Sequence, residues 1–284
     1  MKILILGASG LIGSTTLRVL SYREGWNVYG SIRSEATKWL LPMIDPSRFV
    51  TNLDVHNFSS VINVLQEVKP DVLINCIGGT KHKKEGNNPI DAIYLNSLLP
   101  HKLAQFCELI NCRFIHISTD CVFSGKSGSY TESSVTDAED VYGKSKALGE
   151  VDYGNVITLR TSTIGHELQT KHGLLDWFLS QNGSCKGFSK AVFSGFPTVV
   201  FAQIIRDLVL PHPELKGLFN VAAMPINKHD LLQLIAKIYD KQINIARDDT
   251  FRVDRSLNAS KFNQATGYNP PSWQSLIETM YQYR

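Results

Sequence analysis

This sequence lacks the long hydrophobic runs and the one-sided charge that mark several classes of protein. Its first apolar run ends at Gly7 after a few residues, too short for a membrane span or the core of a signal peptide. The 29 lysines and arginines nearly balance 26 acidic residues, and the net charge of +3 is far from the basic excess of a nucleic-acid-binding domain. We therefore expect no membrane segment and no nucleic-acid partner.

Cysteine is also scarce. The five cysteines include no C-x-x-C pair, and their odd number disfavours both a disulfide framework and a zinc knuckle. The eight histidines show no H-E-x-x-H spacing, so we predict no metal site. These absences favour a reduced protein of the cytoplasm with buried thiols.

What the sequence does contain is an alternation of short apolar runs and helical patterns. Apolar residues recur at helical spacing over Phe58–Val68, whereas the runs between such segments are continuously apolar. This alternation predicts an α/β fold with a doubly wound, parallel Rossmann sheet and ligands at the carboxyl ends of the strands. The expected strands are Ile3–Leu6, Val28–Ile32, Phe49–Thr51, Val72–Asn75, Phe114–Ile117 and Val156–Leu159.

A glycine-rich turn follows the first expected strand and opens a helical pattern. Glycines at GxxGxxG spacing let the chain turn sharply and bring backbone N–H groups against a pyrophosphate at a helix N-terminus. Glycine also marks ordinary turns, so it is the position between strand and helix that favours a dinucleotide site. The residues of this turn expected to bind the cofactor are Gly7, Ser9, Gly10, Leu11, Ile12 and Gly13.

The end of the second expected strand indicates which dinucleotide binds. An acid there would bind a ribose 2′-hydroxyl, whereas an arginine accommodates a 2′-phosphate. The strand ends at Ser31-Ile32-Arg33 without an acid, so Ser31 and Arg33 favour NADP(H) over NAD(H). The alternative is that Arg33 is a solvated surface residue. Further cofactor contacts are expected after the third and fourth strands, from Asp54, Val55, Cys76, Ile77 and Gly78.

The alternation of strands and helices loosens after Arg160. Prolines punctuate the remainder, where two helical patterns stand out, at Phe201–Leu210 and Asp230–Tyr239. We predict an NADP-binding Rossmann domain over residues 1–160 and a smaller, irregular, mainly substrate-binding region over residues 161–284. Some segments of the second region are expected to return to the first domain.

The most informative stretch runs from Tyr142 to Lys146. A tyrosine and a lysine four residues apart share one face of a helix, and an ammonium beside a phenol lowers the phenol pKa from about 10 toward neutrality. Such a tyrosine exchanges a proton with a substrate oxygen at physiological pH, while the lysine can also hold the nicotinamide ribose. For this motif taken alone, the alternative is that Tyr142 and Lys146 are an incidental pair on a helix.

A second group of polar residues lies near the carboxyl edge of the expected sheet. Thr119 closes the fifth strand, where its hydroxyl can donate a hydrogen bond to a carbonyl under reduction. Asn96 is expected to order a water or bind backbone near Lys146, with a helix-surface role as the alternative. The basic run Lys81–Lys84 either attracts a diphosphate or forms a solvated loop.

Together these motifs resemble the extended short-chain dehydrogenases and, more narrowly, the dTDP-4-dehydrorhamnose reductase group. The likeness covers nearly the whole chain and is most specific between Gly7 and Lys146. It implies that Thr119, Tyr142 and Lys146 are catalytic and that the second region holds a nucleotide sugar. The segments that carry it are Gly7–Gly13, Ser118–Gly125, Tyr142–Lys146, Leu159–Ser162, Gly195–Thr198 and Asp254–Asn258.

The resemblance also implies further contacts. Tyr142, Lys146 and Thr161 are expected to touch the cofactor in addition to the residues above. Substrate contacts are expected from Asp120, Cys121, His166, Thr198 and Arg255.

The implied activity is NADPH-dependent reduction of a keto group, at C4, on a nucleotide-linked 6-deoxysugar for surface polysaccharide or glycan precursors, with a homodimer as the expected assembly. Cys121 stands where these reductases usually have tyrosine and where sugar-nucleotide 4,6-dehydratases have a glutamate, which disfavours dehydration. A nucleotide-sugar epimerase is one alternative, weakened by Arg33. A non-catalytic NADP-binding regulatory subunit, like the beta subunit of methionine adenosyltransferase, is another.

Overall fold

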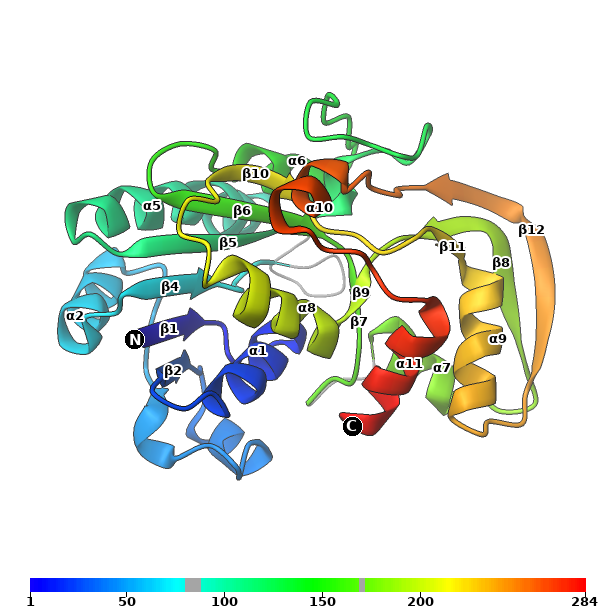
Figure 1. Ribbon diagram of the computed structural model, residues 1–284, viewed down its shortest axis with the longest axis horizontal. Helices are drawn as coiled ribbons and strands as arrows, with labels where there is room; N and C mark the ends of the chain where they lie inside the picture. Colours follow the sequence, from blue (N-terminus) through cyan, green and yellow to red (C-terminus); the bar gives the residue numbers. More distant parts are fainter. Residues whose placement is uncertain (80–87, 169–171) are drawn as a thin grey trace.

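The computed structural model describes residues 1–79, 88–168 and 172–284. Seven parallel strands form its main sheet in the order β10-β6-β5-β4-β1-β2-β3 (Figure 1). The strand order reverses between β1 and β4, which is where an open parallel sheet binds its ligand. The predicted doubly wound α/β fold is confirmed. The strands are β1 Lys2–Leu6, β2 Asn27–Ser31, β3 Phe49–Val50, β4 Val72–Asn75, β5 Arg113–Thr119, β6 Val156–Thr161 and β10 Gly217–Asn220.

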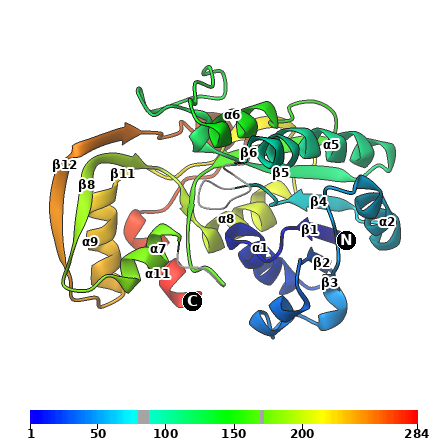
Figure 2. The same cartoon turned by 180° about the vertical axis from the view of Figure 1, so that it is seen from behind.

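Helices cover both faces of this sheet because successive strand residues point to opposite sides. Ile3 and Ile5 of β1 belong to one apolar cluster, with residues of α1 and α8, whereas Leu4 and Leu6 belong to a second, with residues of α2 and α5. Figure 2 shows α1 and α5 on opposite sides of the sheet. The four helices are α1 Leu11–Ser21, α2 Phe58–Val68, α5 Leu99–Leu109 and α8 Thr198–Ile204.

A smaller unit is built on a three-stranded sheet of order β11-β8-β12, well separated from the N-terminal strands in Figure 1. Its apolar core joins residues of α7, α9 and α11, among them Phe178, Ile235 and Ile277, which are fully buried. The elements are α7 Leu174–Ser180, β8 Ser184–Phe193, β11 Ile226–Asn227, α9 Lys228–Ile238, β12 Asn244–Asp254 and α11 Trp273–Gln282.

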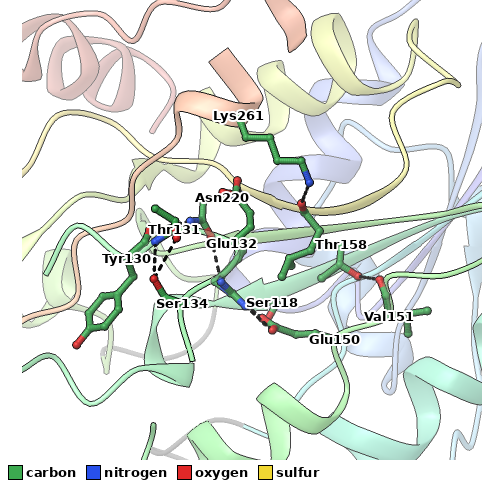
Figure 3. Close-up of polar contacts among 12 residues, drawn as sticks. Ser118, Tyr130, Thr131, Glu132, Ser134, Glu150, Val151, Thr158, Asn220 and Lys261 are labelled. Carbon is green, nitrogen blue, oxygen red and sulfur yellow. Dashed lines mark hydrogen bonds and ion pairs between the residues drawn. The ribbon is translucent and has the colours of Figure 1, made fainter. Parts of the chain in front are cut away.

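Two elements beyond Arg160 belong to the layers of the large sheet. Helix α8 packs on α1, and β10 pairs with β6. Asn220, at the end of β10, donates from its side chain to Tyr130 O (2.8 Å) and from its backbone to the Glu132 carboxylate (2.8 Å; Figure 3). The loop after β5 is thereby fixed to a strand from the second half of the chain. The division at residue 160 itself stays a prediction.

The structure corrects some expected boundaries. The helix expected at Phe201–Leu210 begins earlier, as α8, and continues as a π-helical segment over Ile205–Val209. The helix expected at Asp230–Tyr239 is α9, which begins two residues earlier. Strands β8, β10 and β12 were not expected. β10 is only four residues long, β8 mixes buried and exposed residues and carries two lysines, and β12 is largely exposed and charged.

Candidate active site

The glycine-rich turn joins β1 to α1 at the carboxyl edge of the sheet. Gly7 has a φ of +78°, in the left-handed region where glycine is favoured, and its N–H donates to Ser31 Oγ (3.0 Å). A side chain at Gly13 would place its Cβ 2.2 Å from Gly7 O, so glycine is required for this turn to close against the helix. The first N–H groups of α1 therefore lie where a pyrophosphate would bind.

A pocket opens beside this turn, at the carboxyl ends of β1, β2 and β4. Arg33 stands exposed at its rim. Cys76, which precedes the lining residue Ile77, is partly buried, and its desolvation raises the thiol pKa to about 12. Cys76 is thus a packing residue. Asp54 instead accepts a hydrogen bond from the backbone of His56 (3.0 Å), and Leu53, which sequence reasoning missed, lines the pocket. The lining residues are Gly7, Ser9, Ser31, Ile32, Arg33, Leu53, Val55 and Ile77.

Thr119 and Tyr142 meet at the end of β5. Thr119 is the last residue of that strand, and Tyr142 lies in the first turn of α6 (Val141–Leu148). The Thr119 hydroxyl donates to Asp120 Oδ1 (3.2 Å) and accepts from the backbone of Cys121 (3.2 Å), and it lies close enough to Tyr142 to act on the phenol pKa. Thr161, the last residue of β6, lies opposite Thr119 in the strand register. The structure thus places the two hydroxyls predicted to act on one carbonyl near each other.

The expected lowering of the Tyr142 pKa is wrong for this arrangement of side chains. Burial of the phenol is the largest effect and raises its pKa, whereas the hydrogen bond with Thr119 acts in the opposite direction. Lys146 is itself buried, and its Nζ donates to Ile117 O (2.8 Å). Burial lowers the Lys146 pKa to about 8, against the opposing charge of Glu150. At neutral pH the phenol is therefore protonated and the lysine is mostly charged.

Asn96 contacts residues next to Lys146. It is fully buried in a π-helical segment, Ile93–Leu98, so the alternative of a helix-surface role is wrong. Its side chain accepts from Gly79 N (2.9 Å) and donates to Ser145 Oγ (3.0 Å), one residue before Lys146. This agrees with the expectation that Asn96 binds backbone near the lysine.

A buried ion pair lies behind the catalytic strand. Arg160 and Glu150 are exposed by only 1% and 8%, and two of their N···O distances are 2.6 and 2.9 Å. Ser118, which precedes Thr119, donates to the same carboxylate (2.6 Å; Figure 3). Sequence reasoning missed Glu150, since nothing in its local pattern shows that Arg160 would lie against it.

The residues expected to bind the substrate include some that directly follow Thr119 and others from the second half of the chain. Asp120 is buried, which raises its pKa, and the charge of Arg255 opposes this rise. Arg255 Nε donates to Phe123 O (2.8 Å), which fixes the guanidinium beside the turn that carries Cys121. Lys228, which was not among the expected site residues, interacts electrostatically with Asp120, Cys121 and Arg255. Its only sequence signal is a lysine at the start of a helical pattern.

His166 and Thr198, which are expected to bind the substrate, make polar contacts within the protein. His166 is hydrogen-bonded through Nε2 to Tyr239 Oη (2.9 Å), and burial lowers its pKa. Thr198 is buried at the start of α8, where its hydroxyl lies 3.3 Å from that of Thr15 on α1. These contacts account for both side chains within the fold, and substrate binding by either residue stays a prediction.

The sequence predicts neither a metal site nor a membrane segment. Residues 1–79, 88–168 and 172–284 contain no group of three or more His, Cys, Asp or Glu side chains arranged to hold a metal ion. Over the same ranges, no helix combines the length and apolar character needed to cross a bilayer. The basic run Lys81–Lys84 lies outside the described residues.

The parallel sheet, the glycine-rich turn and the Thr119, Tyr142 and Lys146 side chains define an extended short-chain dehydrogenase/reductase. The family model described as the RmlD substrate binding domain matches residues 1–183, so the chain belongs to that family. The predicted resemblance is confirmed.

Relatives of the chain are named as reductases and as a subunit of a methionine adenosyltransferase. A probable low-salt glycan biosynthesis reductase, Agl14, of Haloferax volcanii is 34% identical over 53% of this chain and 48% of its own, so the chain spans about half the length of that relative. A dTDP-4-dehydrorhamnose reductase of Aggregatibacter actinomycetemcomitans is 24% identical over 99% of both chains. Methionine adenosyltransferase 2 subunit beta of Xenopus tropicalis is 30% identical over 98% of this chain and 80% of its own.

Solved structures agree with the fold along its full length. The dTDP-4-dehydrorhamnose reductase of Bacillus anthracis, solved in complex with NADP, superposes with a TM-score of 0.80 over 99% of both chains. The two sequences are only 20% identical, so this comparison concerns the fold.

Proposed function

We propose that this protein is an NADPH-dependent reductase that converts a keto group, at C4 of a nucleotide-linked 6-deoxysugar, into a hydroxyl. The observation that carries the proposal is the proximity of Thr119 and Tyr142 at the end of β5, with the buried Lys146 ammonium on the same helix. The full-length likeness to a protein named dTDP-4-dehydrorhamnose reductase supports this substrate class.

The residues around the glycine-rich turn fit a dinucleotide phosphate. The absence of a side chain at Gly7 and Gly13 leaves the α1 N-terminus open to a pyrophosphate, and Ser31 and Arg33 line the adjoining pocket where a 2′-phosphate would lie. Lys146, charged below its pKa of about 8, would hold the nicotinamide ribose. When bound, this cofactor supplies a hydride for the carbonyl carbon.

The chain's own side chains supply the proton and hold the carbonyl. Tyr142, whose raised pKa keeps it protonated at neutral pH, donates its proton to the carbonyl oxygen as the C–H bond forms, which gives the alcohol. Thr119 donates a hydrogen bond to the same oxygen and stabilises the charge that develops there. A phenol that stays protonated at neutral pH can donate a proton, which is the role that a reduction requires.

Two further features favour reduction over related reactions. Cys121 offers no carboxylate beside Tyr142, and 4,6-dehydration needs an acid there. Arg33 at the pocket rim favours a cofactor with a 2′-phosphate, whereas an epimerase that retains NAD would favour an acid.

The wider setting is also part of this proposal. We assign residues 1–160 mainly to the cofactor and residues 161–284 mainly to the nucleotide sugar, in a cytoplasmic enzyme of glycan precursor synthesis. The name of the Haloferax volcanii relative supports the glycan role. A homodimer stays a prediction, which sedimentation of the purified protein would test.

A regulatory subunit is the second candidate function. Its support is the 30% identity, over 98% of this chain, to a protein named methionine adenosyltransferase 2 subunit beta. The presence of Thr119, Tyr142 and Lys146 favours chemistry, but the same residues can serve as cofactor ligands only. NADPH binding without turnover would fit the regulatory subunit.

The test is NADPH oxidation by the purified protein with dTDP-, UDP- and GDP-linked 4-keto-6-deoxysugars. We expect turnover with one nucleotide sugar and formation of the corresponding alcohol. Tight NADPH binding without turnover across the panel would contradict the reductase and favour the regulatory subunit.

Replacing Arg33 with alanine is expected to raise the KM for NADPH about tenfold and to leave the KM for NADH nearly unchanged. The reason is the loss of one charge-assisted hydrogen bond to the 2′-phosphate, which NADH does not carry. Steady-state kinetics with both cofactors measures the effect. Arg252, an exposed arginine of β12, provides the matched control. Equal changes for both cofactors would show that Arg33 does not contact the 2′-phosphate.

A further inference from the structure

The Glu150 carboxylate joins β5 to β6 at the residues that precede Thr119 and Thr161. Ser118 of β5 and Arg160 of β6 lie opposite each other in the strand register. Glu150 Oε1 accepts from Ser118 Oγ (2.6 Å) and from Arg160 Nε (2.9 Å), and Oε2 accepts from Arg160 Nη2 (2.6 Å). One carboxylate, directly after the C-cap of α6, therefore fixes this helix to both strands.

Arg160 extends these contacts to a third strand. Its Nη1 donates to Asn220 Oδ1 (3.3 Å), and Asn220 lies opposite Arg160 in the register of β6 and β10. The Asn220 amide donates in turn to Tyr130 O (2.8 Å) and Asn258 O (3.2 Å). The polar contacts thus run without a break from the end of α6, across β5, β6 and β10, to the loop after β5 and the segment after β12 (Figure 3).

Arg160 also packs against the loop after β5. Its guanidinium lies over the Phe123 ring (4.8 Å to the centroid), and that ring stacks on Tyr130 (4.0 Å between centroids). Phe123 O accepts from Arg255 Nε (2.8 Å). The segment from Cys121 to Tyr130 is therefore held by Arg160 on the side of the sheet and by Arg255 from the second half of the chain.

Stability alone does not explain charges at this place. Ser118, Arg160 and Asn220 are buried, and an apolar pair of similar volume is often as stable as a buried ion pair, because burial removes the hydration of both charges. Hydrogen bonds supply fixed directions, and a fully paired polar network makes its surroundings rigid. These residues lie at the carboxyl ends of their strands, which is where a sheet of this type binds its ligand.

We propose that Glu150 and Arg160 are positioning residues, which hold Thr119 and α6 in the relative position that catalysis needs. This inference rests on the proposed function, because it concerns the same site and reaction. Ser118 connects the carboxylate to β5, and Glu150 connects it to α6, the helix of Tyr142. A small displacement of Thr119 relative to Tyr142 is expected to slow the chemical step and to leave NADPH binding nearly unchanged.

The double variant Glu150→Leu/Arg160→Met separates stability from catalysis. It contains no unpaired buried charge, so we expect its unfolding midpoint in urea to be near that of the wild type. We expect kcat for keto-sugar reduction to fall by about 10–100-fold, the order expected for misplaced reacting groups, and the Kd for NADPH to stay nearly unchanged. Wild-type kcat at wild-type stability would overturn the proposal, because the ion pair would then serve only the fold.

Two single variants keep the proposal falsifiable if the double variant folds poorly. Ser118→Ala removes the hydroxyl that joins Glu150 to β5, whereas Thr158→Val removes a buried hydroxyl of β6 that donates to Val151 O (2.6 Å; Figure 3). Each variant loses one buried hydrogen bond, so we expect similar decreases in the unfolding midpoint. Only Ser118→Ala is expected to lower kcat, by about tenfold. Equal values of kcat in the two variants would overturn the proposal.

Hydrogen–deuterium exchange tests the positioning without turnover. In protein saturated with NADP⁺, we expect the amides of residues 119–130 to exchange about tenfold faster in Ser118→Ala than in the wild type or Thr158→Val, the order expected for one lost hydrogen bond. Unchanged exchange would overturn the proposal. Faster exchange, in a protein whose wild type reduces no keto sugar, would support the positioning role and contradict the reductase function alone.

Discussion

Replacing Tyr142 with phenylalanine is expected to lower kcat for keto-sugar reduction by about 10²–10⁴-fold, the usual contribution of a positioned general acid. The substitution removes only the phenolic oxygen, which is the group that we propose donates the proton and that lies near Thr119. The ring remains to fill the partly buried position. Stopped-flow measurement of NADPH oxidation under saturating substrate separates this chemical step from binding.

The control for this substitution is a second tyrosine. Tyr153 is 43% exposed and pairs with His101 (2.7 Å), so Tyr153→Phe is expected to leave kcat unchanged. NADPH affinity is expected to be unchanged in Tyr153→Phe, because Tyr153 is not among the residues expected to touch the cofactor. If Tyr142→Phe kept more than a tenth of the wild-type kcat, another group would be the proton donor.

The pH dependence of the wild type follows from the same geometry. Tyr142 has a raised pKa and stays protonated through neutral pH, so it imposes no loss of rate there. Lys146 loses its charge as the pH rises through about 8. Any decline in kcat/KM above neutral pH would thus report the lysine before the tyrosine.

The fold was predictable where strands are buried on both faces. β1, β4 and β6 read as continuous apolar runs because each lies between two layers of helices. β12 could not be predicted in this way, since it is largely exposed and its charged residues are paired locally, as in the contact of Arg247 with Asp249. β10 was missed because a strand of four residues is too short to show a clear apolar pattern.

The site was predictable where its chemistry is local in sequence. The glycine-rich turn and the Tyr142–Lys146 pair each lie within one short segment. The structure places Tyr142 near Thr119, which comes from another segment. The direction of the Tyr142 pKa was predicted wrongly, because desolvation depends on the whole fold and is the largest effect on the phenol. Asn96 and Lys228 depend on contacts between segments far apart in the sequence, which spacing does not reveal.

Removal of the Glu150 carboxylate is expected to have the largest effect on stability. Glu150→Ala leaves the Arg160 guanidinium buried with no carboxylate, and breaking such a pair costs about 3–5 kcal/mol of unfolding free energy. Ser118 loses its acceptor at the same time, next to Thr119. Urea denaturation followed by circular dichroism measures the loss as a lower unfolding midpoint.

The mechanism of this loss is tested by removing both charges. The double variant Glu150→Leu/Arg160→Met has no unpaired charge, and an apolar pair of similar volume is expected to recover most of the lost stability. Glu139→Ala breaks the exposed pair with Lys126 (2.8 Å) and is expected to leave the midpoint unchanged. If the double variant were as unstable as Glu150→Ala, the lost packing around Ser118 and Phe123, over whose ring Arg160 lies (4.8 Å), would outweigh the unpaired charge.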